Sequence, residues 1–143
     1  MTRSVASPPS PALAAALAED LERERRLIRA YRMHLPAVGS PRVRRLFERG
    51  LEIKRRHEAE LDRLLSAHGG APVAEGPADL SGPGPREVLT WHAEQEHVLA
   101  LRYRDHLRLA ADPAVRLVLQ RCAADQAEHL ALLKSLYRDF SAA

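Results

Sequence analysis

Residues 22–35 read ERERRLIRAYRMHL and residues 94–107 read EQEHVLALRYRDHL, so the chain carries two copies of one segment. The similarity extends well beyond this segment. A shift of 72 positions aligns residues 15–68 with residues 87–140 without a gap, and 16 of the 54 aligned pairs are identical. Chance would give about a tenth of the pairs in so biased a composition. The alignment therefore indicates that a whole structural unit is duplicated.

Each copy predicts a helical hairpin, because two segments with helical apolar periodicity flank a helix start signal. Ser40-Pro41 in the first copy and Asp112-Pro113 in the second combine a residue that caps helix starts with a proline at the first helical position. The four predicted helices cover about residues 11–35, 41–68, 85–109 and 113–140.

The segment between the two hairpins shows no helical pattern. Gly69-Gly70 is a stop signal for the second helix. The 17 residues of the connector, 69–85, can span roughly 55 Å when extended, which exceeds the length of a four-helix bundle. The second and third helices can therefore run parallel. We predict one all-α domain over residues 1–143, a four-helix bundle with a long crossover and a flexible N-terminus at residues 1–10.

Composition excludes several other classes of protein. The chain is 45% hydrophobic but only 4% aromatic, and it is rich in Leu, Ala, Arg and Glu, which favour helices over sheets. A single cysteine, Cys122, excludes an internal disulfide and a thiolate zinc cluster. No uncharged apolar run approaches the roughly 20 residues that span a bilayer. We therefore expect no membrane association and a cytoplasmic location.

Polar residues interrupt the apolar inner face of every predicted helix. Heptad-like spacing locates these faces, which are apolar at both ends and polar in the middle. In the third helix the predicted inner face is Leu89, Ala93, Glu96, Ala100, Tyr103 and Leu107. Across the four helices the polar inner positions are Glu24, Lys54, His57, Glu96, Gln126 and His129.

Buried carboxylates need compensation, because an unpaired one costs several kcal/mol in a bundle core. Glu24 and Glu96 lie at symmetric places in the duplicated unit, and so do His57 and His129. The acids and imidazoles therefore either compensate one another or share an ion. Carboxylate and imidazole from facing helices suit iron, manganese or zinc.

The pattern resembles the ferritin-like superfamily, most closely its rubrerythrin-like members. Glu24 with Tyr31, and Glu96 with Tyr103, resemble the Glu-x6-Tyr of the family's first and third helices. Residues 40–65 and 112–136 resemble its second and fourth helices, where a Glu-x-x-His pair supplies two ligands. By this resemblance the matching metal ligands are Glu24, His57, Glu96 and His129. The glutamate of each Glu-x-x-His is replaced, by Lys54 in one copy and by Gln126 in the other.

The replacements leave two interpretations open. Two carboxylates and a protonated Lys54 cannot neutralise two buried divalent ions. One Fe or Mn ion could still be held, with open positions for oxygen or peroxide. Alternatively the core is metal-free, Lys54 pairs with Glu24 or Glu96, and the bundle has a structural, stress-related or protein-interaction role. The residues expected to surround or replace ligands are Lys54, Gln126, Tyr31 and Tyr103, and further candidate ligands are Asp125, Glu128 and His92.

The remaining features carry weaker predictions. Tyr31 and Tyr103 are expected to be core tyrosines bonded to a carboxylate, and His34 and His106 to cap helix C-termini. An arginine-rich stripe on the second helix is interrupted by acids, which favours a solvated face over nucleic-acid binding. A homodimer is among the assemblies that the sequence allows. No residue is assigned a catalytic role, and the absence of a rubredoxin-like cysteine domain leaves no built-in electron donor.

Overall fold

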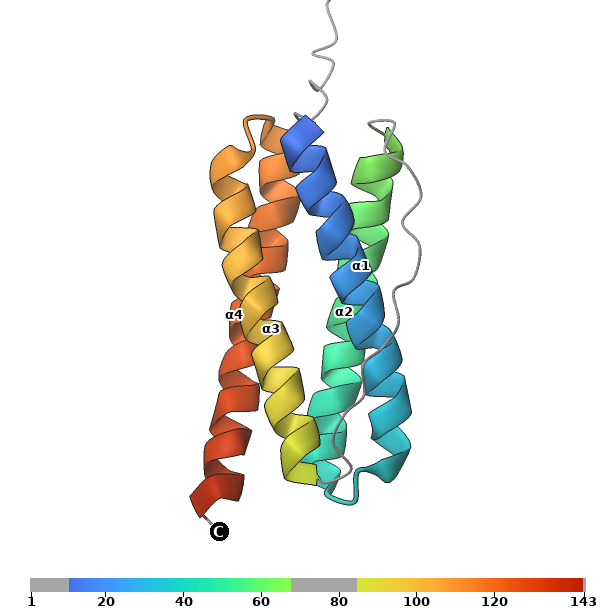
Figure 1. Ribbon diagram of the computed structural model, residues 1–143, viewed down its shortest axis with the longest axis vertical. Coiled ribbons are helices and arrows are strands. Elements are labelled where there is room, and N and C mark those ends of the chain that lie inside the picture. Colours follow the sequence, from blue (N-terminus) through green and yellow to red (C-terminus); the bar gives the residue numbers. More distant parts are fainter. Residues whose placement is uncertain (1–10, 68–84, 143) are drawn as a thin grey trace, which may run out of the picture.

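The computed structural model describes residues 11–67 and 85–142, which form four long helices (Figure 1). The helices are α1 (Pro11–His34), α2 (Pro41–Ala67), α3 (Pro85–Leu109) and α4 (Pro113–Ala142), and a short 3-10 helix η1 (Leu35–Ala37) follows α1. The predicted helices are confirmed to within about two residues. The Gly69-Gly70 stop, the connector and the N-terminal ten residues lie outside the described part.

The helices form two antiparallel hairpins packed against each other. α1 and α2 make the first hairpin and α3 and α4 the second, with α1 against α3 and α2 against α4. Figure 1 shows α2 and α3 running in the same direction, as predicted. The all-α four-helix bundle is confirmed. No stretch in the four described helices is apolar enough over a sufficient length to cross a bilayer.

Both predicted start signals act as caps. The Ser40 hydroxyl accepts a hydrogen bond from the amide of Val43 at 3.4 Å. The Asp112 carboxylate accepts hydrogen bonds from the amides of Ala114 at 2.7 Å and Val115 at 3.3 Å. These contacts satisfy amides that lack partners in the first helical turn. The signals therefore position the starts of α2 and α4.

His34 and His106 lie in the last turns of α1 and α3, as predicted, but among the described residues neither ring bonds to a terminal carbonyl as a cap would. His106 is buried and its Nδ1 contacts Asp20 of α1, while His34 Nδ1 lies 2.9 Å from His92 Nε2 of α3. Both rings reach the facing hairpin because their positions lie on the inner side of the last turn. The carbonyl groups near the end of α3 are instead satisfied by Arg116, which donates to Leu107 and Ala110.

The core is apolar at both ends of the bundle and polar in the middle. All seven residues of the inner face of α4 are buried: Val115, Leu119, Cys122, Gln126, His129, Leu133 and Leu136. The predicted inner face of α3 is partly wrong, because Ala93, Ala100 and Leu107 are only half-buried. Three other residues of α3 are buried in their place, namely His92, Leu99 and His106. The polar middle layer contains the candidate site.

Candidate functional site

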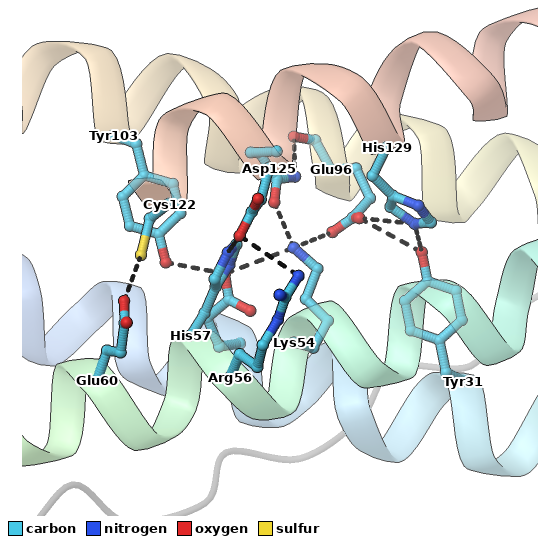
Figure 2. A network of polar contacts seen from close by, with 12 residues as sticks. Tyr31, Lys54, Arg56, His57, Glu60, Glu96, Tyr103, Cys122, Asp125 and His129 are labelled. Atoms are coloured by element: carbon cyan, nitrogen blue, oxygen red, sulfur yellow. Dashed lines mark hydrogen bonds and ion pairs between the residues drawn. The ribbon is translucent and has the colours of Figure 1, made fainter. Parts of the chain in front are cut away.

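Lys54 of α2 lies at the centre of the polar layer with no exposed surface (Figure 2). Its ammonium nitrogen is 2.8 Å from Glu96 Oε1 and 3.4 Å from Glu24 Oε1. It also donates to Gln126 Oε1, and Gln126 in turn donates to the backbone carbonyl of Glu96 at 2.9 Å. One ammonium group thus joins oxygens from α1, α3 and α4. Lys54 pairs with both carboxylates rather than with one of them.

One side of Lys54 is occupied by what we call the Glu24 half-site: Glu24, His57, Tyr103 and Asp125. Tyr103 donates to Glu24 Oε1 at 2.8 Å. His57 Nδ1 lies 3.2 Å from the same oxygen, and His57 Nε2 lies 3.1 Å from Asp125 Oδ2. Each nitrogen of the imidazole thus faces one carboxylate oxygen. The His57 ring therefore bridges the buried Glu24 and the partly exposed Asp125.

The other side is what we call the Glu96 half-site: Glu96, His129 and Tyr31. His129 Nε2 lies 3.1 Å from Glu96 Oε2 and 2.8 Å from the hydroxyl of Tyr31. Tyr31 also donates to Glu96 Oε2 at 3.4 Å. The predicted tyrosine–carboxylate contacts are therefore confirmed in both half-sites. Burial raises the pKa of Tyr31 and of Tyr103 well above its ordinary value, so both hydroxyls remain protonated donors.

Gly50 of α2 permits the close packing of the Glu96 half-site. A methyl group added at Gly50 would lie 2.7 Å from His129 Nε2 and 2.8 Å from Cζ of Tyr31. No side chain can therefore be present at this position without moving the two rings. The duplication aligns Gly50 with Cys122, which is buried beside the Glu24 half-site with its sulfur 4.0 Å from Glu60.

A single ammonium group compensates two carboxylates. Burial opposes the charge of Lys54, but Glu24 and Glu96 together raise its pKa. Burial also opposes ionisation of Glu24, yet the charge of Lys54 and a hydrogen bond from His57 hold its pKa below the ordinary value. At Glu96 burial outweighs the attraction of Lys54, and the pKa is raised. The layer thus places one ammonium between two carboxylates, of which Glu24 has a lowered pKa and Glu96 a raised pKa.

His129 is a neutral ring in this environment. Burial and the nearby charge of Lys54 lower its pKa to about 3. Its Nδ1 is buried without a hydrogen-bond partner among the described residues. A neutral imidazole beside Glu96 leaves that carboxylate with Lys54 as its cationic partner, which agrees with its raised pKa.

The structure brings most, but not all, of the predicted site residues together. Glu24, His57, Glu96 and His129 share one layer with Lys54 and Gln126, and both tyrosines reach the carboxylates. Of the further candidate ligands, Asp125 reaches His57. Glu128 is exposed. His92 is buried but contacts His34 instead of the carboxylates.

Two polar pairs near the layer were missed by sequence reasoning. Asp20 has no exposed surface, accepts a hydrogen bond from Arg102 at 2.7 Å and contacts His106. The His34–His92 contact is its counterpart, because the duplication aligns Asp20 with His92 and His34 with His106. The equivalent positions of the two copies therefore hold an acid–imidazole pair, Asp20 with His106, and a pair of imidazoles, His92 with His34.

The residues present do not fit the metal centre that the resemblance implies. A tetrahedral ion needs four donor atoms. Of the donor atoms of the four matching ligands, only Glu24 Oε2 and His129 Nδ1 are buried without a partner in the described residues. Within the same residues, no group of three or more His, Cys, Asp and Glu side chains is arranged to hold an ion. The ammonium of Lys54 lies among the oxygens that an ion would need.

Several solved structures are similar to this chain, among them the following three. Ferritin-like, diiron-carboxylate proteins from Bacillus anthracis str. Ames match with a TM-score of 0.82 and 23% identity, over 88% of this chain and 95% of that chain. A two-domain protein from Anabaena variabilis, which contains DJ-1/ThiJ/PfpI-like and ferritin-like domains, matches with a TM-score of 0.76 and 19% identity. The match covers 92% of this chain and 37% of that chain.

The third structure is a conserved hypothetical protein, rv2844, from Mycobacterium tuberculosis, with a TM-score of 0.76 and 21% identity, over 89% of this chain and 98% of that chain. No family model and no curated protein sequence matches the chain. Identities this low show the fold alone. At that level they confirm the resemblance inferred from the Glu, Tyr and His spacing.

Proposed function

We propose that this chain, which has the ferritin-like fold, works without a metal cofactor and serves as a structural or protein-interaction bundle. In this proposal the ammonium of Lys54 replaces the divalent ion at the centre of the bundle. The observation that carries it is the contact of one fully buried ammonium with oxygens from three helices. Its expected location is the cytoplasm.

Electrostatics support the proposal. A divalent ion placed about 4 Å from a protonated lysine would be repelled by about 8 kcal/mol at an effective dielectric constant near 20. Glu24 and Glu96 supply only two negative charges, and Lys54 already uses both. An ion could bind only after Lys54 lost its proton, which its raised pKa opposes.

The polar layer has a structural use in this proposal. Lys54 satisfies Glu24 and Glu96 together only when α1, α2 and α3 are at the correct height relative to one another. A shift of one helix by a turn would leave a buried charge without a partner, which is costly. The layer therefore selects one register of the helices, because the apolar ends of the core are less selective.

The test is metal content together with metal-dependent stability. Protein purified without added metal should hold less than about a tenth of an equivalent of Fe, Mn or Zn, and adding each ion under anaerobic conditions should leave the Tm unchanged, because only a bound ion stabilises the folded state. About one equivalent of Fe or Mn that survives dialysis against chelator and raises the Tm would overturn the proposal in favour of a single-ion site.

A matched variant provides the positive control. The double substitution Lys54→Glu, Gln126→Glu restores the glutamate of both Glu-x-x-His pairs in this chain. It should take up Fe or Mn and gain thermal stability on metal addition, because it has four carboxylates and no buried ammonium. If this variant and the wild type bind metal equally well, Lys54 does not exclude the ion.

A further inference from the structure

The outer face of α3 carries two apolar residues among charged ones. We call this face the α3 stripe: Glu94, His97, Val98, Leu101, Arg104, Asp105 and Arg108. These residues recur at steps of three and four, so they share one side of the helix. All seven are exposed, and Val98 and Leu101 each expose 38% of their surface.

The equivalent face of α1 provides a matched comparison within the same chain. It has arginine at positions 25, 26 and 29, where α3 has His97, Val98 and Leu101. The arginines of α1 are paired inside the chain: one contacts Glu58 at 3.1 Å and another contacts Glu22 at 3.0 Å. In the α3 stripe, by contrast, none of the four charged residues pairs with any other residue that the structure describes.

We infer that the α3 stripe binds the α3 stripe of a second copy of this chain, with the two helices antiparallel. This inference specifies the surface of the proposed protein-interaction role, but it does not depend on the state of Lys54. In such a two-fold contact the same patch serves on both subunits, so its residues must be complementary to themselves. The order of residues along α3 meets this requirement.

The α3 stripe is complementary to itself when Leu101 lies on the two-fold axis. Residues at equal distances on either side of Leu101 then face each other. Glu94 and Arg108 are each seven positions away, which opposes a carboxylate to a guanidinium. His97 and Asp105 are each four positions away, which opposes an imidazole to a carboxylate. The two copies of Leu101 then form the apolar centre, and each Val98 faces the aliphatic stem of Arg104, which is three positions from the axis on the other side.

A hollow beside the stripe supports this arrangement. It has a volume of about 360 Å³ and lies between α3 and α4, where Glu94 and His97 face Lys134 and Tyr137. In the antiparallel pair, Arg108 of the second copy would approach Glu94 at this hollow. The equivalent face of α1 cannot pair in this way, because Arg29 would meet its own copy and Arg26 would meet Arg32, and opposed like charges are unfavourable.

The first test is the mass of the full chain as a function of concentration. Sedimentation equilibrium from about 5 to 500 µM should show a monomer of 15.9 kDa converting to a dimer, since a contact this small binds weakly. Leu101→Arg, which installs the residue that α1 has at the equivalent position, should weaken dimerisation at least tenfold. Leu132→Arg on α4 is the control, because Leu132 exposes 47% of its surface and lies off the stripe.

Charge exchange provides the second test. Glu94→Arg and Arg108→Glu should each weaken the dimer about tenfold, and the double variant should recover affinity to within a few-fold of the wild type. A damaged fold could not give this recovery. A wild type that stays monomeric at 500 µM, a Leu101→Arg variant that dimerises normally, or a double variant without recovery would each overturn the inference. These outcomes are independent of metal content, so failure here is distinguishable from failure of the metal-free core.

Discussion

The two half-sites occupy equivalent positions in a duplicated unit, yet one reaches the surface and the other is sealed. The two half-sites differ at one aligned pair of positions, Asp125 and Ile53. Asp125 is partly exposed, contacts His57, and lines a hollow of about 330 Å³ at the surface. Ile53 is 3% exposed and lies in the core. The acids and rings therefore keep equivalent positions in both copies, whereas the Glu24 half-site alone has a partly exposed carboxylate at the position that a buried isoleucine takes in the other copy.

A second aligned pair separates the half-sites further. Gly50 lets His129 and Tyr31 approach the backbone of α2, whereas its counterpart Cys122 fills the corresponding space beside the Glu24 half-site. The sealed half-site holds a neutral imidazole with one buried nitrogen that has no hydrogen-bond partner among the described residues. The open half-site holds an imidazole with a carboxylate at each nitrogen. The two halves should respond differently to mutation and to pH.

Removing the shared cation should have the largest effect. Lys54→Met leaves Glu24 and Glu96 buried without their common partner, and we expect a loss of about 3–5 kcal/mol in the free energy of unfolding. Urea denaturation measures it. The double variant Lys54→Met, Glu96→Gln should recover about half of the loss, since it removes the carboxylate closest to the ammonium. Unchanged stability in Lys54→Met would contradict the structural role of the charge pair.

Filling the glycine should have the next largest effect and should be specific to the sealed half-site. Gly50→Ala should lose about 1–3 kcal/mol, because the new methyl group overlaps His129 and Tyr31. Alanine is otherwise about 1 kcal/mol better than glycine inside a helix, so a net loss reports the overlap. Cys122→Ala, at the equivalent position, is the control and should lose no more than about 1 kcal/mol. A Gly50→Ala variant more stable than the wild type would show that the two rings can move away.

Acid should weaken the sealed half-site through His129. The folded pKa near 3 lies below the ordinary value of 6.5, so the unfolded chain binds a proton that the folded chain does not. Stability from this group is present above about pH 6.5 and is lost as the pH falls toward 3. Between pH 6.5 and 5, His129→Gln should reduce the slope of unfolding free energy against pH by up to about 1.4 kcal/mol per unit. Parallel curves for variant and wild type would contradict this assignment.

The fold and the composition of the polar layer could be predicted from the sequence because both depend on local spacing. The caps at Ser40 and Asp112 mark two helix starts, and the duplication places Glu24 and Glu96 at the same height. The seven-residue step from Glu24 to Tyr31 covers two helical turns, which puts both residues on one face. These inferences needed no knowledge of which helix packs beside which.

The inner face of α3 could not be predicted in this way. Two stripes pass through Glu96 and Tyr103: one continues through Ala100, and the other through His92 and Leu99. Spacing alone does not distinguish the two stripes. A preference for small apolar residues over histidine favours the stripe through Ala100, which is not the buried one. His92 is buried because it contacts His34 of the other hairpin. This contact joins residues that lie far apart in the sequence. For the same reason the burial of Asp20, which depends on Arg102 and His106, was missed.

The smallest effect is expected at the residue that opens the Glu24 half-site. Asp125→Asn keeps the shape of the side chain but removes the charge facing His57 Nε2 at 3.1 Å. Because Asp125 is 34% exposed, water already screens this contact, and the loss in unfolding free energy should not exceed about 1 kcal/mol and should shrink in 0.5 M salt. Arg56 also contacts Asp125, at 3.6 Å, so Arg56→Gln is the control that separates the two partners. If Asp125→Asn lowers the unfolding free energy as much as Lys54→Met does, the open half-site is coupled to the buried charge pair more tightly than its exposure implies. The contrast between the two half-sites would then depend on something other than access to solvent.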